Sequence, residues 1–200
     1  VAYVNVFGAS NYHTYYSPAL VYADNLGPNV GTYIAEASSH EFGHNLGLSH
    51  DGTASVSYYA GQGTGLVSWA PIMGNSYSNN VTQWSKGEYT GANQTQDDVA
   101  IISTKLGYRA DDDGNSADAG TPLQVNADGT VDASNPELDP HNLLPQNKGV
   151  LNNAADVDVF SFNAGAGNVS FTVTPAWDAF YRATTRRGAN VDVGLELLDS

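Results

Sequence analysis

The chain has 200 residues, of which 41% are hydrophobic, an ordinary share for a chain that folds around an apolar core. Its formal net charge is −14, from 21 acidic residues against 7 Lys and Arg, which argues against nucleic acid or an anionic membrane as a partner. Cysteine is absent, which excludes disulfides and thiolate metal sites, so a transition metal must be held by His, Asp, Glu or water.

The first segments of the chain have the pattern of strands. Residues 1–8 alternate apolar with small or polar side chains, and residues 18–22 form a short apolar run, so both are predicted to be strands joined by a loop. No stretch reaches the roughly 20 apolar residues of a membrane helix, and we expect no insertion into a membrane. Because the chain begins and ends inside strand-like runs and shows no signal peptide, we expect it to be a piece of a longer protein.

Two helices are predicted further along. Residues 32–46 have apolar side chains at helical spacing and are followed by Gly47, a residue type that commonly ends helices. Residues 51–95 are rich in Gly, Ser, Tyr and Asn with little periodicity, which indicates irregular loops with packed aromatic rings. Asp97 then has the character of an N-cap for a helix that ends before Gly107.

The predicted first helix carries the motif HEFGHNLGLSHD. His40 and His44 are four residues apart and share one helix face, so they can bind one zinc ion. Glu41 points in another direction and is better placed to act on a water molecule as a general base. A catalytic zinc typically has three protein ligands, and His50 can supply the third if Gly47 turns the chain back sharply.

Two histidines lie outside this motif. His13 and His141 have no partner at ligand spacing, and we interpret both as packed or surface residues.

The motif resembles the extended zinc-binding motif of the metzincin metallopeptidases, and Asp51 after the third histidine resembles their adamalysin-like branch. That resemblance implies a methionine turn beneath the zinc, for which Met73 is the only methionine available. Some members use a tyrosine two residues after this methionine as a further ligand, but Asn75 stands there. Tyr77 is displaced and is not predicted to be a ligand. Asp51 is expected to orient the turn after His50 through a buried hydrogen bond.

The remaining chain resembles a bacterial secreted subgroup of these enzymes. The sequence after the motif is similar to that subgroup, and the tail is similar to the pre-peptidase C-terminal domain, a β-sandwich. This second resemblance rests on the pattern D-x-D-x-F-x-F, formed by Asp156, Asp158, Phe160 and Phe162. Short alternating runs at 157–162, 168–175 and 191–199 agree with antiparallel strands.

An acidic, small-residue stretch separates the two predicted parts. Asp111, Asp112, Asp113 and Asn115 crowd oxygen ligands around Gly114, and two interpretations are open: a calcium site and a solvated linker. The spacing does not match an EF-hand loop.

The sequence therefore predicts an α+β fragment in three parts. Residues 1–108 would form a metzincin-like zinc peptidase domain with a partial upper sheet, an active-site helix and a C-terminal helix. Residues 109–118 would be the linker, and residues 119–200 an incomplete antiparallel β-sandwich.

The expected function is that of a secreted zinc metalloendopeptidase that cleaves internal peptide bonds of a protein or peptide substrate. Zinc is the expected cofactor, calcium a possible second one, and nucleic acid is not an expected partner. Two alternatives are a non-catalytic secreted binding module with a structural zinc site, and a zinc hydrolase of non-peptide amides.

Overall fold

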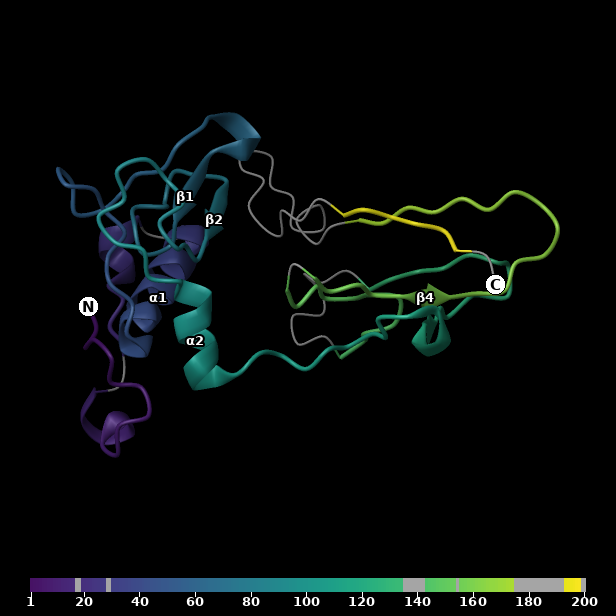
Figure 1. Cartoon of the computed structure of the whole chain (residues 1–200), viewed down its shortest axis with the longest axis horizontal. Helices are drawn as coiled ribbons and strands as arrows, with labels where there is room; N and C mark the ends of the chain where they lie inside the picture. Colours follow the sequence, from purple (N-terminus) through teal and green to yellow (C-terminus); the bar gives the residue numbers. More distant parts are fainter. Residues whose placement is uncertain (17–18, 28–29, 135–142, 154, 175–192, 199–200) are drawn as a thin grey trace. The chain divides into compact units, whose positions relative to one another are not determined.

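The computed structural model describes residues 1–16, 19–27, 30–134, 143–153, 155–174 and 193–198 (Figure 1). The chain divides into two compact units, Val1–Gly107 and Tyr108–Ser200. Within the described ranges, no helix is long and apolar enough to cross a membrane. The helices are the π-helical turn η1 (Tyr12–Tyr16), the 3-10 helices η2 (Ala23–Leu26), η3 (Gly65–Val67) and η4 (Ala117–Ala119), and the α-helices α1 (Gly31–Leu46) and α2 (Asp98–Leu106).

Both α-helices form where the sequence predicts them. Helix α1 ends at Gly47, whose φ of 108° lies in the left-handed region that favours glycine. The Gly47 N–H donates to the His44 carbonyl at 2.9 Å, and the Leu48 N–H donates to the Gly43 carbonyl at 3.0 Å. This pair of bonds is a Schellman motif, which satisfies the last carbonyls of the helix and reverses the chain.

Helix α2 is capped as expected and packs against α1 (Figure 1). The side chain of Asp97 accepts a hydrogen bond from the Ala100 N–H at 2.9 Å, the usual bond of an N-cap. Asp98, the next residue, is fully buried.

A short parallel sheet lies in the region predicted to be irregular. Strands β1 (Trp69–Pro71) and β2 (Val81–Gln83) pair in register from Trp69 opposite Val81. The Ile72 N–H extends the pairing by donating to the Gln83 carbonyl at 2.8 Å. The sheet therefore fixes the backbone just before Met73.

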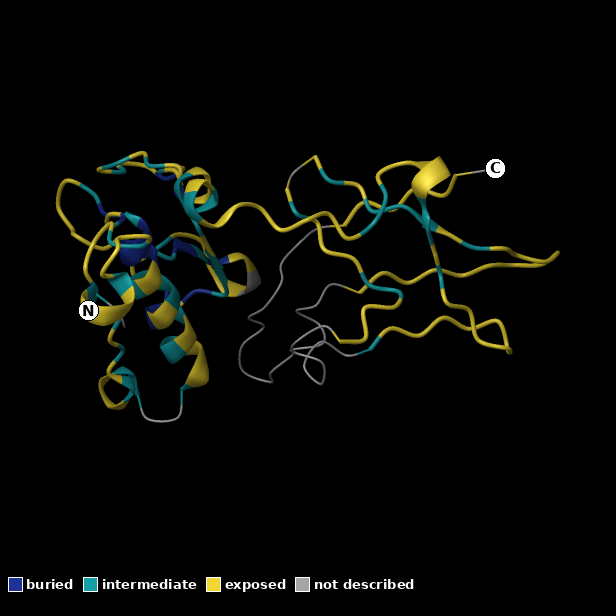
Figure 2. Cartoon of the chain, turned by 90° about the horizontal axis from the view of Figure 1, so that it is seen from below, coloured by how far each residue is buried: buried dark blue, intermediate teal, exposed yellow. Residues whose placement is uncertain are grey.

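The core of the first unit gathers around the C-terminal half of α1. Leu46, Leu48, Ala70 and Met73 are at most 1% exposed. Figure 2 shows the buried residues, in dark blue, gathered in this unit. The first half of the motif HEFGHNLGLSHD thus lies on the buried C-terminal half of α1.

The two strands predicted at the start of the chain do not form, so the partial upper sheet is absent from the described residues. The N–H groups of Asn5 and Val6 donate to the carbonyls of His44 and Asn45, at 2.8 and 3.0 Å. Val1 and Leu20 exchange one pair of hydrogen bonds, but no ladder follows. A strand needs a partner along its length, and here the end of α1 takes those N–H groups instead.

The second unit contains less sheet than predicted. Strands β3 (Thr121–Pro122) and β4 (Phe160–Ser161) form a two-residue parallel pair, whereas antiparallel pairing was expected. The described residues of 168–175 and 191–199 contain no strand, and none of the unit's described residues is buried. Without a buried face to fix the register, strand pairing is weakly specified, and the β-sandwich stays a prediction.

Candidate metal centre

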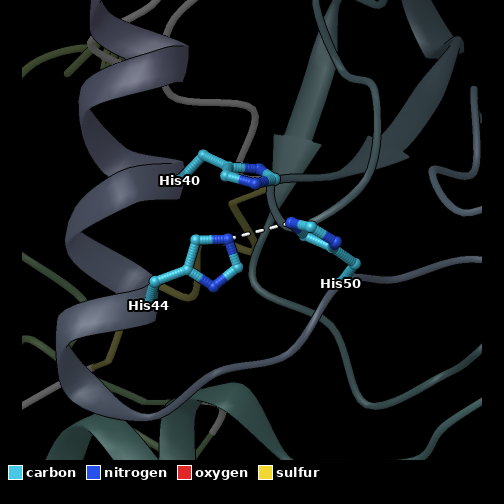
Figure 3. A group of neighbouring side chains, drawn as sticks. All are labelled: His40, His44 and His50. Atoms are coloured by element: carbon cyan, nitrogen blue, oxygen red, sulfur yellow. Dashed lines mark hydrogen bonds between the residues drawn. The ribbon is translucent and has the colours of Figure 1, made fainter. Parts of the chain in front are cut away.

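Three histidine side chains converge at the end of α1. His40 and His44 project from the helix, and His50 approaches from the chain that follows the Gly47 turn (Figure 3). Their ligand nitrogens lie within 4.8 Å of one another, and Nε2 of His44 is 2.9 Å from Nε2 of His50. The turn at Gly47 thus brings His50 to the face that carries the other two.

Main-chain carbonyls fix the tautomers of two of these rings. Nδ1 of His40 lies 2.8 Å from the Ile72 carbonyl, and Nδ1 of His44 lies 2.8 Å from the Leu48 carbonyl. A carbonyl oxygen only accepts, so each Nδ1 carries the proton and each Nε2 keeps a lone pair. This is the common arrangement of a metal-ligating histidine, whose other nitrogen donates to a fixed acceptor.

One of the nitrogen–nitrogen distances is close to that of a tetrahedral zinc site. Two nitrogens bound at about 2.05 Å in a tetrahedron lie about 3.3 Å apart. The Nε2 atoms of His44 and His50, at 2.9 Å, need only a few tenths of an ångström to reach that separation. Two ring nitrogens this close need a proton or a cation between them, and three histidine nitrogens form a known ligand set of catalytic zinc.

The electrostatic surroundings keep two of the rings neutral. Burial lowers the pKa of His40, and burial together with the neighbouring His44 and His40 lowers the pKa of His50. Neutral imidazole is the form that binds a metal, so at pH 7 these two rings do not have to lose a proton to bind one.

Glu41 lies beside the histidines without joining them. Its charge is near enough to His40 and His50 to act on the pKa of both, in the direction opposite to burial. It is not part of the ligand cluster in the described residues, which consists of the three histidines. The carboxylate of Glu41 therefore lies close to the three histidines without being one of the clustered groups.

Comparison with known proteins adds no relative. No family model, curated protein or solved structure matches this chain. The residues of the site and the resemblance of its motif are therefore the features that point to a function.

Met73 lies directly against α1, the helix that carries His40 and His44. It is fully buried, and a Cβ atom added to Gly43 would come 2.6 Å from its sulfur. The carbonyl of Met73 accepts a hydrogen bond from the Asp51 N–H at 2.9 Å. Met73 thus connects the residue before the second histidine with the residue after the third.

Asp51 is completely buried beneath the turn. Its carboxylate accepts a hydrogen bond from the Gln94 amide, and burial raises its pKa to about 6 while this bond acts in the opposite direction. The Gly52 N–H donates to the Asn93 side chain at 3.1 Å, and the Ser49 N–H donates to the Gln96 side chain at 2.8 Å. A polar segment before α2 therefore holds the turn that carries His50.

Sequence reasoning missed this segment and a clamp built on Glu36. The Glu36 carboxylate accepts hydrogen bonds from the hydroxyls of Ser76 and Thr82, both at 2.7 Å. These bonds fasten the Met73 turn and β2 to α1, one helical turn before His40. The clustering of Asn and Gln in NQTQD was the available signal for the segment, while the partners of Glu36 have no sequence signal.

Sequence reasoning also missed Tyr58. Its ring centroid lies 4.3 Å from that of His50 and 6.0 Å from that of His40. Tyr77, which was not predicted as a ligand, has its pKa raised by burial and then by the charges of Glu41 and Glu36. His13 packs on Tyr12 and is not in the cluster, and His141 lies outside the described residues.

A cluster of acids in the second unit differs from the one predicted for calcium. The carboxylates of Asp111, Asp112 and Asp158 lie within 4.8 Å of one another, and Asp113 is not among the three. The Asn115 amide donates to Asp111 at 2.5 Å, and its oxygen accepts from the Val157 N–H at 3.0 Å. The amide oxygen expected as a calcium ligand is thus engaged with the backbone.

Proposed function

We propose that the first unit is a zinc-dependent metalloendopeptidase that cleaves internal peptide bonds of proteins, with Glu41 as general base. The observation that carries the proposal is the convergence of His40, His44 and His50 next to a carboxylate that is not itself in the ligand cluster. The resemblance of HEFGHNLGLSHD to the metzincin motif supports it, and the resemblance to a secreted bacterial subgroup supports action outside the cell.

The residues have separate roles in this proposal. Zinc bound to the three histidines would supply Lewis-acid chemistry, polarising the scissile carbonyl and making water nucleophilic near neutral pH. Glu41 takes a proton from the attacking water and passes it to the leaving amine. The carbonyls of Ile72 and Leu48 hold the rings of His40 and His44 in the ligating orientation.

The proposal includes a fold for each unit and a class of substrate. The metzincin-like fold of the first unit and the pre-peptidase C-terminal β-sandwich of the tail both rest on the sequence resemblance. A general base beside an activated water serves amide hydrolysis, and the resemblance of the motif to the metzincin peptidases favours a protein or peptide as the substrate.

The decisive experiment compares the parent with Glu41→Gln, which removes the base and keeps the side chain's size. We expect the longest natural chain containing these residues to cleave an unfolded protein, and the variant to bind one equivalent of zinc without cleaving it. If both proteins bind zinc and neither cuts a broad peptide set, the non-catalytic binding module is the better account. Cleavage of small amides alone would favour the non-peptide hydrolase.

For the second unit, the acid cluster favours calcium, an ion that takes six to eight oxygen ligands. One carboxylate oxygen of Asp158 is buried without a hydrogen-bond partner, and burial, followed by the neighbouring acids, raises the pKa of Asp158 to about 6. Calorimetric titration of calcium into chelator-treated protein is expected to show one site that Asp158→Asn weakens at least tenfold. No binding heat and an unchanged Tm at millimolar calcium would support the solvated linker.

A further inference from the structure

Tyr58 is carried by a loop that is folded tightly behind the metal ligands. The Tyr59 N–H donates to the Asp51 carbonyl at 2.7 Å, and the Thr53 N–H donates to the Val56 carbonyl at 2.8 Å. A Cβ atom added to Gly52 would come 2.4 Å from that Val56 carbonyl oxygen. The loop therefore has little freedom to move Tyr58 away from His50.

The two tyrosines at the end of this loop have opposite surroundings. The ring of Tyr59 stacks on Tyr89 at a centroid distance of 4.1 Å and an angle of 8°, and Tyr89 is buried. Tyr58 contacts His50 instead and is 46% exposed. The anchored Tyr59 ring fixes the backbone next to Tyr58, whose own ring lies against His50.

The Tyr58 ring is covered on one part only. Contact with His50 occupies one part of the ring, and nearly half of the residue still faces solvent beside the metal ligands. No hydrogen bond is made by its hydroxyl within the described part of the chain. A rigid, exposed aromatic ring offers large contact area to a bound group at small entropic cost.

We propose that Tyr58 is a specificity-determining residue, whose ring forms the surface against which a substrate side chain beside the scissile bond packs. The inference rests on the proposed peptidase function and adds a substrate class to it. Aromatic and long aliphatic side chains pack on such a ring through offset stacking and apolar contact, whereas Gly and Ala do not reach it.

The test uses peptides that differ only at the positions flanking the cleaved bond, with Leu or Phe compared with Ala. Tyr58→Ala is expected to reduce the preference for Leu or Phe about tenfold, mainly through KM, the lower end of what apolar side-chain contacts discriminate. Tyr58→Phe keeps the ring and is expected to keep the preference. Tyr22→Ala is the matched control, since that ring is 57% exposed and contacts none of the histidines.

A second readout does not depend on turnover. In the Glu41→Gln background, the Kd for an uncleaved Leu or Phe peptide should rise about tenfold with Tyr58→Ala, while the Kd for the Ala peptide and the zinc content stay unchanged. An equal loss on all peptides would show that Tyr58 acts only through His50, and a matching loss in Tyr58→Phe would assign the effect to the hydroxyl. Either result overturns the inference while the peptidase function stands. A parent that cleaves no peptide removes the proposed function, and this inference with it.

Discussion

Asp98 is a titratable carboxyl group in the interior of the first unit, and its replacement by Asn removes that group. Asp98 is 0% exposed, and its Oδ2 accepts one hydrogen bond from the Ser85 N–H at 3.0 Å, while Oδ1 has no partner. Burial, together with the charges of Asp51, Asp97 and Glu88, raises its pKa from 3.8 to about 7. The folded protein therefore holds this proton over a pH range in which the unfolded chain has lost it.

The sign and size of the effect follow from this shift. Stability from the neutral carboxyl is fully present below about pH 4 and is lost as the pH rises to about 7, because the unfolded chain ionises first. A shift of about three pKa units corresponds to about 4 kcal/mol. The free energy of unfolding should therefore fall by about this amount across the window, and Asp98→Asn should not show this part of the fall.

Urea unfolding at pH 4, 6 and 8 measures this difference. The asparagine amide places an unpartnered donor where Oδ1 lies, which costs about 1–3 kcal/mol at every pH, so the slope with pH is the test. Asp97→Asn is the control, because asparagine is an equally good N-cap and Asp97 is exposed. It removes only one of the smaller contributions to the raised pKa of Asp98, so it should change the slope with pH much less than Asp98→Asn does. A difference between Asp98→Asn and the parent that is constant from pH 4 to 8 would refute the reasoning.

Three further substitutions test the metal centre. Gly47→Ala should lower the free energy of unfolding in urea by about 1–2 kcal/mol, because φ is 108° at this position. Gly31→Ala at the start of α1 is the control and should be neutral or stabilising, because a Cβ there meets nothing within 4 Å. Met73→Ala should lower the unfolding free energy by about 2–5 kcal/mol and Met73→Leu by less than about 1.5 kcal/mol, so equal effects would place Met73 outside the core. Glu36→Ala should weaken zinc binding about tenfold in a chelator competition, since it frees the turn that carries the Ile72 carbonyl, and Glu36→Gln should recover most of it. Unchanged zinc affinity in Glu36→Ala would contradict that role.

Local patterns predicted the parts of the fold whose cause is local. Helix α1, its end at Gly47 and the cap at Asp97 follow from periodicity and from the conformations these residues favour. The convergence of His40, His44 and His50 follows as well, because one helix face and one turn are enough to build it.

Parts of the fold that depend on distant partners were not predictable in this way. Residues 1–8 alternate like a strand, but their N–H groups donate to the end of α1. The β1–β2 pair joins two three-residue segments that are poor in alternation, and each becomes a strand only through pairing with the other. Tyr58 and Glu36 could not be predicted as part of the site, because a single tyrosine or glutamate forms no sequence pattern and its contacts come from segments that only the fold brings together.

The geometry also explains why the motif includes residues that bind no metal. The acceptors for His40 and His44 are main-chain carbonyls, from Ile72 and Leu48, so no side-chain substitution at either acceptor removes them directly. Their positions depend instead on the backbone, which Gly47 turns at one end and the buried Met73 supports at the other. Substitutions at Gly47 or Met73 should therefore act on zinc affinity through ring orientation, in proportion to how far they move these two carbonyls. Substitutions at exposed positions of α1 such as Ser38, whose hydroxyl donates to the Ile34 carbonyl of the same helix, should leave zinc affinity unchanged.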